Sequence, residues 1–119
     1  MSPWVKRLAP ILAVTVAAVL PALAAGGTLV TKKVTVGDDY YGPTKLTVTK
    51  NTAIKWSWVT ENTNSHDVKL SSGPKGVSKF HSPSAASDFS YTKKLTVAGT
   101  YKIICTLHQD MKMTIVVRK

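Results

Sequence analysis

Short segments in which apolar and polar residues alternate dominate the chain after residue 28, and they constrain its fold more than any other feature. An alternation of period two places all apolar side chains on one face, which is typical of a strand that packs on a core. The segments are 29–36, 46–49, 53–59, 66–70, 89–97, 101–105 and 113–117. Turn-forming residues separate them about every 8–12 residues, and no helical period interrupts them. The sequence therefore predicts an all-β domain, a two-sheet antiparallel β-sandwich with Greek-key connections.

The first residues of the chain have the features of a signal peptide. Two basic residues are followed by an uncharged run over residues 8–23, and residues 22–24 read Ala-Leu-Ala, a pattern that signal peptidase cleaves. The alternative is an uncleaved membrane anchor, but the apolar run is shorter than the roughly 20 residues that span a bilayer. We therefore expect removal of residues 1–24 and export of the domain 25–119 to the periplasm, the cell envelope or the extracellular space.

The charge and the cysteine content limit the classes of protein that remain. Sixteen Lys and Arg against six Asp and Glu give a net charge of +10, which favours an acidic surface on any partner. The lysines are scattered rather than clustered, so a nucleic-acid-binding surface is not indicated. The single cysteine excludes an internal disulfide, although small exported domains usually depend on disulfides or a metal ion. A metal site is therefore the first functional hypothesis.

Residue types that bind metal ions gather near the C-terminus. Cys105, His108 and Met111 have the spacing Cys-x2-His-x2-Met in a loop between two predicted strands, and His66 begins an upstream strand. Taken singly, the cysteine is compatible with a buried core thiol and the methionine with core packing. Together, two imidazoles, a thiolate and a weak thioether are the ligand set of a trigonal copper site with a long axial sulfur. Met113 is a competing sulfur.

Several further segments of residues 28–119 match, in the same order, segments of a known protein family. They are Tyr41-Gly42-Pro43 before Leu46-Thr47-Val48, then Ile54-Lys55-Trp56, Ser65-His66-Asp67-Val68, and Gly99-Thr100-Tyr101 before Cys105. In these segments the chain resembles the cupredoxins, the small blue copper proteins that include plastocyanin, pseudoazurin and amicyanin, and its short copper loop is most similar to that of amicyanin. The resemblance implies a cupredoxin-like domain that binds one copper ion, as Cu(I) or Cu(II). The implied metal ligands are His66, Cys105, His108 and, as the axial thioether, Met111, with Met113 in the last strand.

The resemblance also implies a function. It predicts a monomeric type 1 (blue) copper protein, not an enzyme, that carries one electron to or from a transient redox partner. The ring edge of His108 would be exposed, and Leu107 and the Tyr41–Pro43 turn would surround it with apolar surface. The alternative is copper storage, delivery or resistance without redox cycling, which predicts a Met- or His-rich tract that the chain lacks. A metal-free immunoglobulin-like binding module would leave Cys105 unexplained.

Two positions depart from the family pattern. Asp67 follows the first histidine, where the family commonly has Asn, and an ionised carboxylate only accepts hydrogen bonds. We hypothesise that Asp67 accepts from the Thr106 hydroxyl or nearby backbone N–H groups and lowers the reduction potential; the alternative is a solvated strand residue. Ile104 stands where plastocyanin has an aromatic residue, so we expect one main electron route, through His108. The third histidine, His81, is interpreted as an exposed loop residue.

Overall fold

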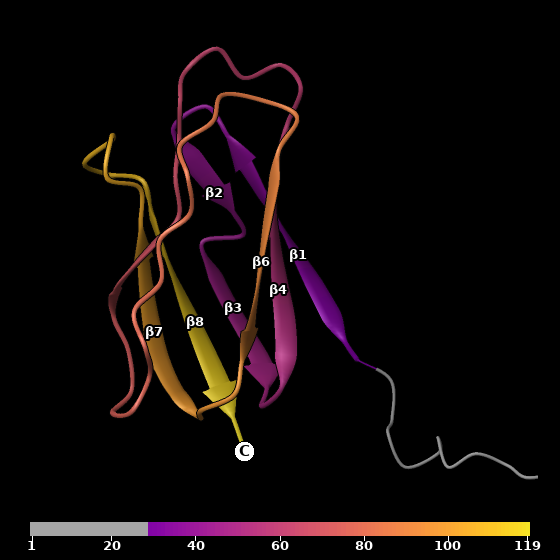
Figure 1. Ribbon diagram of the computed structural model, residues 1–119, viewed down its shortest axis with the longest axis vertical. Helices are drawn as coiled ribbons and strands as arrows, with labels where there is room; N and C mark the ends of the chain where they lie inside the picture. Colours follow the sequence, from indigo (N-terminus) through magenta and orange to yellow (C-terminus); the bar gives the residue numbers. More distant parts are fainter. Residues whose placement is uncertain (1–28) are drawn as a thin grey trace, which may run out of the picture.

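The computed structural model describes residues 29–119, and every regular element among them is a strand (Figure 1). The predicted signal peptide, residues 1–24, lies outside the described residues and stays a prediction. Within the described part of the chain, no helix is long and apolar enough to cross a membrane. The strands are β1 (Thr31–Gly37), β2 (Tyr40–Gly42), β3 (Lys45–Thr49), β4 (Thr52–Trp58), β5 (Lys69–Ser72), β6 (Ser90–Leu95), β7 (Gly99–Ile104) and β8 (Lys112–Arg118).

The strands form two sheets that face each other, with the orders β2-β1-β4-β6 and β3-β8-β7-β5 (Figure 1). The predicted two-sheet sandwich is therefore confirmed, but the prediction of a purely antiparallel arrangement is wrong. Strands β1 and β4 pair in parallel, and so do β3 and β8. The reason is the path from β2 to β3, where the chain changes sheet without reversing direction, so that β4 returns beside β1 with the same direction. An alternating pattern identifies the buried face of a strand but not the direction of its neighbour.

The core lies between the two sheets and consists of the apolar positions that the alternation predicts. In β4, for example, Ile54, Trp56 and Trp58 are all buried. The ring centroid of Trp56 lies 6.3 Å from that of Phe80, in the irregular segment between β5 and β6. This segment contains no strand, but it contributes the buried ring of Phe80 to the core. Aromatic side chains bury large apolar areas, so these contacts hold the segment against the sandwich.

One predicted strand is shorter than expected. The alternation over 66–70 predicts a strand that His66 begins, but β5 begins at Lys69. His66 instead forms an isolated bridge with Ala85, in the segment before β6. The alternation itself is real, since His66, Val68 and Leu70 are all buried. The first histidine is therefore fixed by a loop-to-loop contact rather than by a sheet edge.

The connections β1–β2, β4–β5 and β7–β8 meet at one end of the sandwich (Figure 1). Because Val36 lies opposite Trp58 in the parallel pair, the turn after β1 and the loop after β4 start side by side. At the same end, β7 and β8 pair as far as Ile104 and Lys112, which leaves residues 105–111 as the loop between them. The topology thus brings together three segments that are distant in sequence.

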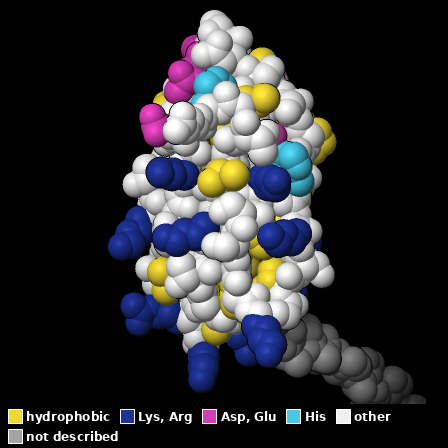
Figure 2. All heavy atoms as spheres, turned by 90° about the vertical axis from the view of Figure 1, so that its left-hand side faces the viewer, with side chains coloured by type: hydrophobic (Ala, Val, Ile, Leu, Met, Phe, Trp, Pro, Cys, Tyr) yellow, Lys and Arg dark blue, Asp and Glu magenta, His cyan; other side chains and the backbone are white. Residues whose placement is uncertain are grey.

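This end of the molecule, here called the loop end, differs in charge from the rest. All six acidic residues of the chain lie at this end: Asp38, Asp39, Glu61, Asp67 and Asp110 belong to the three connections, and Asp88, just before β6, accepts a hydrogen bond from Thr60 of the β4–β5 loop. On the face shown in Figure 2, acidic and histidine side chains gather at this end, whereas lysine and arginine side chains cover the body below it. Among residues 29–119, the net positive charge is therefore concentrated away from the loop end.

Candidate metal centre

Three of the predicted ligands converge at the loop end. One ligand atom each of His66, Cys105 and His108 lies within 4.8 Å of the others. The Cys105 Sγ atom is 3.6 Å from His108 Nδ1, and the centroids of the two imidazole rings are 4.9 Å apart. Sequence spacing placed two of these residues in one loop, and the fold adds the third from a segment about forty positions upstream. A thiol and two imidazoles at these separations can bind one metal ion in common.

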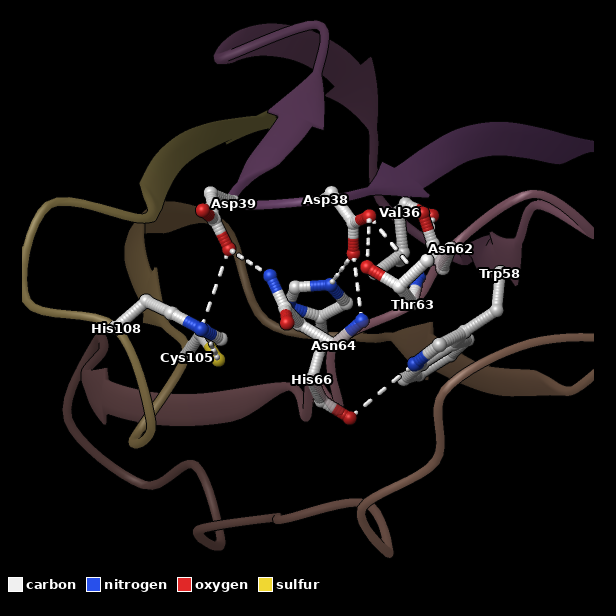
Figure 3. A network of polar contacts seen from close by, with 10 residues as sticks. All are labelled: Val36, Asp38, Asp39, Trp58, Asn62, Thr63, Asn64, His66, Cys105 and His108. Carbon is white, nitrogen blue, oxygen red and sulfur yellow. Dashed lines mark hydrogen bonds and ion pairs between the residues drawn. The ribbon is translucent and has the colours of Figure 1, made fainter.

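His66 is held rigidly on several sides. Its backbone exchanges two hydrogen bonds with Ala85, and its carbonyl oxygen also accepts a hydrogen bond from the indole of Trp58 at 3.1 Å. The side chain is fully buried, and its Nε2 atom lies 2.9 Å from Asp38 Oδ1. Figure 3 shows the ring between Asp38 on one side and Cys105 on the other.

The other ring nitrogen of His66 has no partner in the described part of the chain. Its Nδ1 atom is buried and makes no hydrogen bond. Such an atom costs stability, typically about 1–3 kcal/mol, unless it meets a ligand. A metal ion that also contacts the thiol of Cys105 would satisfy it, and the donor set of two imidazoles with one cysteine suits copper. The residues present therefore fit a copper ion.

Cys105 occupies the base of the loop that follows β7. Its N–H donates to the Met111 carbonyl at 3.0 Å, and the Met111 N–H donates to the His108 carbonyl at 3.1 Å, so the loop closes on itself. Cys105 is buried, and burial raises the pKa of its thiol. The thiol therefore keeps its proton at neutral pH, and a metal ion that binds the sulfur must displace that proton.

His108 lies nearer to the surface than His66. Its side chain is 27% exposed, and its Nε2 atom is 3.2 Å from Oδ1 of Asp39, an exposed residue of the β1–β2 turn. Leu107 and Tyr40 are both exposed large hydrophobic residues of the loop end, as expected for Leu107. The expectation that Tyr41 adds to this apolar surface is wrong, because Tyr41 is buried and its hydroxyl donates to the Asp67 carbonyl.

The two candidate axial sulfurs are both buried. Met113 lies in β8 opposite Ile103 and belongs to the inward-facing row of that strand. Met111 precedes the strand and closes the loop that carries Cys105 and His108. This placement agrees with the sequence preference for Met111, whose role as a ligand stays a prediction.

Asp67 connects the two histidine-bearing loops. Its carboxylate accepts hydrogen bonds from the Thr106 N–H at 2.7 Å and from the Thr106 hydroxyl, which confirms the hypothesis that it accepts from these groups. The alternative, a solvated strand residue, is wrong because Asp67 is only 2% exposed. Burial alone would raise the pKa of Asp67, but hydrogen bonds from His81 and Thr106 outweigh it and lower that pKa. The ring of His81, expected to be only an exposed loop residue, is indeed half-exposed but lies 2.8 Å from Asp67 Oδ2.

The sequence interpretation missed two residues of this site, Asp38 and Asp39. They follow the first predicted strand, residues 29–36, and lie beside the Nε2 atoms of His66 and His108, respectively. Hydrogen bonds from the Thr63 backbone, from the His66 ring and from the Asn64 backbone hold the pKa of Asp38 well below its usual range. The parallel pairing of β1 with β4 brings the turn to this place, and the alternating pattern gave no signal for that pairing.

The comparisons with known proteins agree with this geometry. The family model described as a cupredoxin-like domain matches residues 9–117. One similar solved structure is a reduced-state amicyanin variant, which is 26% identical with a TM-score of 0.64 and covers 74% of this chain and 82% of its own. Another is a reduced Cu(I) amicyanin variant, which is 26% identical with a TM-score of 0.65. The match covers 80% of this chain and 89% of the amicyanin chain. Amicyanin from Paracoccus versutus (Thiobacillus versutus) shares the fold. It is 22% identical with a TM-score of 0.64, and the match covers 80% of this chain and 88% of the amicyanin chain.

A search of curated proteins finds no match. The family model, however, covers most of the chain, and its match agrees with the sandwich and with the convergent donor atoms at the loop end. The chain belongs to the cupredoxin-like family.

Proposed function

We propose that the protein is a type 1 copper protein that carries one electron at a time between redox partners. The observation that carries the proposal is the convergence of His66, Cys105 and His108, together with the buried Nδ1 atom of His66, which has no hydrogen bond among residues 29–119. Similar solved structures include amicyanin in a Cu(I) form. The proposal is thus a binding and electron-transfer role, not an enzymatic one.

Copper in such a site supplies a one-electron couple between Cu(I) and Cu(II). The chain contributes a ligand frame that changes little between the two states, since His66 and Cys105 are buried and held by hydrogen bonds. His108 contributes the route to the surface, because its ring is the partly exposed imidazole of the site. Met111 would be the axial ligand.

We place partner docking around His108. Leu107 supplies exposed apolar area beside it, and contacts of redox partners are usually small and transient. The net charge favours a partner with an acidic docking surface. Because the acidic residues of this chain all lie at the loop end, we propose that the lysines of the body pair with that acidic surface, at the rim of the contact. The electron-transfer rate with such a partner then falls as ionic strength rises; a rate that does not fall would exclude this steering.

We further propose that the protein acts outside the cytoplasm as a monomer, in the periplasm, the cell envelope or the extracellular space. The support is the pattern of residues 1–24, a basic start, an apolar run and a small-x-small end. The mass of the protein isolated from its native host tests this proposal. A chain that begins at residue 25 supports export with cleavage, and a full-length chain in the membrane fraction would indicate an anchor instead.

Voltammetry of the copper-loaded protein tests the carrier function. A carrier shows a reversible one-electron wave, and the copper stays bound through repeated cycles. A storage or delivery protein binds Cu(I) tightly but gives no reversible Cu(II) state, and that outcome would replace the carrier with the alternative function. The variant Cys105→Ser is the control, because it removes the thiolate while keeping a side chain of similar size; it is expected to give no wave.

A further inference from the structure

We propose that Asp38 is a positioning residue of the copper site, which fixes the tautomer of His66 and strengthens that imidazole as a ligand for Cu(II). The inference rests on the proposed copper-binding function and adds to it a residue from the turn between β1 and β2. The geometry behind it is the 2.9 Å contact between Asp38 Oδ1 and His66 Nε2 (Figure 3).

The Asp38 carboxylate is itself held in place. Its Oδ2 atom accepts the Thr63 N–H at 2.9 Å and the Thr63 hydroxyl at 3.1 Å, and its Oδ1 atom accepts the Asn64 N–H at 3.0 Å. Thr63 and Asn64 belong to the loop that leads to His66, so the carboxylate connects the β1–β2 turn to this loop. A carboxylate with so many fixed donors cannot rotate away from the imidazole without losing several hydrogen bonds.

The contact determines which nitrogen of His66 carries the proton. An ionised carboxylate only accepts hydrogen bonds, and a neutral imidazole has one N–H and one lone pair. Asp38 therefore selects the tautomer with the proton on Nε2, and the lone pair is then on Nδ1. That atom is the buried one that has no partner among residues 29–119, on the ring of a residue that converges with Cys105. The imidazole is thus prepared to bind a metal ion before the ion arrives.

A carboxylate behind a histidine ligand also changes the strength of that ligand. The hydrogen bond makes the imidazole a stronger electron donor to a metal ion, and loss of such a partner typically costs 10–100-fold in metal affinity. The stronger donor stabilises Cu(II) more than Cu(I), because Cu(II) carries the higher charge. We therefore expect Asp38 to lower the reduction potential of the site.

The neighbouring Asp39 offers a matched control. It carries the same charge and lies 3.2 Å from the Nε2 atom of His108, but its side chain is 55% exposed, against 35% for Asp38. Water and salt screen an exposed pair, so its effect on the bound ion is small. The replacements Asp38→Asn and Asp39→Asn therefore remove equal charge from adjacent positions that differ in burial and in hydrogen bonding.

The tautomer is tested without any metal. Nitrogen NMR of the copper-free wild-type protein reports the protonation of each ring nitrogen of His66. The proposal predicts a proton on Nε2 and none on Nδ1. A proton on Nδ1, or a mixture of the two tautomers, would overturn it, and this measurement decides the question even where a variant at Asp38 fails to fold.

The ligand strength is tested by Cu(II) and Cu(I) affinity and by the reduction potential of three variants. Asp38→Asn is expected to lose 10–100-fold in Cu(II) affinity and less in Cu(I) affinity. Each tenfold difference between the two losses raises the potential by about 59 mV. Asp39→Asn is expected to shift the potential in the same direction by less than half as much. Thr63→Val removes one hydrogen bond to Asp38 but leaves the His66 contact, so we expect lower thermal stability with an unchanged potential.

Two outcomes contradict the inference. Equal shifts in Asp38→Asn and Asp39→Asn would mean that charge alone matters, and a result for Asp38→Asn like that for Thr63→Val would mean a purely structural role. The proposed function fails in a different way. In that case the wild-type protein itself shows no thiolate-to-Cu(II) absorption band, whatever the tautomer of His66.

Discussion

The two loops that carry the imidazoles are built differently. His66 is fully buried, and hydrogen bonds from Ala85 and Trp58 and the contact with Asp38 surround it. His108 lies in a seven-residue loop closed by two backbone hydrogen bonds, its side chain is 27% exposed, and its Nε2 atom faces the exposed Asp39. The difference supports the proposal that the first loop keeps the geometry of the site and that a redox partner docks at the second.

The largest expected effect comes from removing each imidazole in turn. His108→Gly opens a hole that solvent can reach, so added imidazole is expected to enter it and restore the thiolate-to-Cu(II) absorption band. His66→Gly opens a hole inside the protein, and added imidazole is expected to restore nothing. Visible absorption during an imidazole titration measures both. Equal recovery in the two variants would remove the distinction between the buried and the exposed imidazole.

The next effect concerns Asp67, the residue that connects the two loops. Asp67→Asn removes a charge that Thr106 and His81 stabilise, and hydrogen bonds to charged groups are worth about 1.5–3 kcal/mol. We expect a lower free energy of unfolding and a higher reduction potential, because the lost negative charge had favoured Cu(II). An unchanged or lowered potential would refute this role.

Thr106→Val is the matched control for Asp67→Asn. It removes the hydroxyl that donates to the carboxylate but keeps the charge and the backbone hydrogen bond from Thr106. We expect a loss of about 1 kcal/mol in stability and a smaller change in potential.

A smaller effect is expected from the tyrosine that supports the first loop. Tyr41→Phe removes the hydroxyl that donates to the Asp67 carbonyl, which costs about 1 kcal/mol of stability. Tyr101→Phe is the control, since its hydroxyl donates to Val97, between β6 and β7 at the opposite end of the sandwich. Chemical denaturation is expected to give similar losses for both, but only Tyr41→Phe weakens Cu(II) binding. Weaker binding in both would mean that the site responds to global stability.

The smallest effect on stability is expected at Leu107, on the exposed side of the second loop. Leu107→Ser removes apolar surface that is already in water, so the free energy of unfolding changes by no more than about 0.5 kcal/mol. The rate of electron exchange between Cu(I) and Cu(II) forms of the protein is expected to fall severalfold. Val30→Ser is the control, because Val30 is equally exposed, at 51%, and precedes β1 at the opposite end. A similar fall in both would place the contact surface elsewhere.

Most of the strands could be predicted from the sequence, because their apolar residues alternate. Ile54, Trp56 and Trp58 are buried as the pattern requires. The parallel pairs could not be predicted in this way, since alternation is the same for a parallel and an antiparallel neighbour. The prediction that Tyr41 contributes to the exposed apolar surface was wrong for a related reason. Tyr40 and Tyr41 are both aromatic, and a shift of one residue decides which faces the core.

The convergence of three candidate metal ligands could also be expected from the sequence. Cys105 and His108 are close together in the chain, and the alternating segment after His66, together with the family resemblance, favours His66 over His81 as the third candidate. The contact of Asp38 with His66 was not accessible, because it joins residues 28 positions apart and depends on the register of β1 against β4. The carboxylate of Asp38 therefore reaches the site through the pairing of β1 with β4, which no sequence motif indicates.

The central claim is that Cys105 and the two imidazoles bind copper together, and visible absorption tests it most directly. Cu(II) is added to the purified protein and, in parallel, to Cys105→Ser. The account predicts an intense blue or green thiolate-to-Cu(II) band that saturates at one equivalent, is absent from the variant, and disappears and returns as the protein is reduced and reoxidised. A colourless protein, or a band that persists in Cys105→Ser, would contradict it.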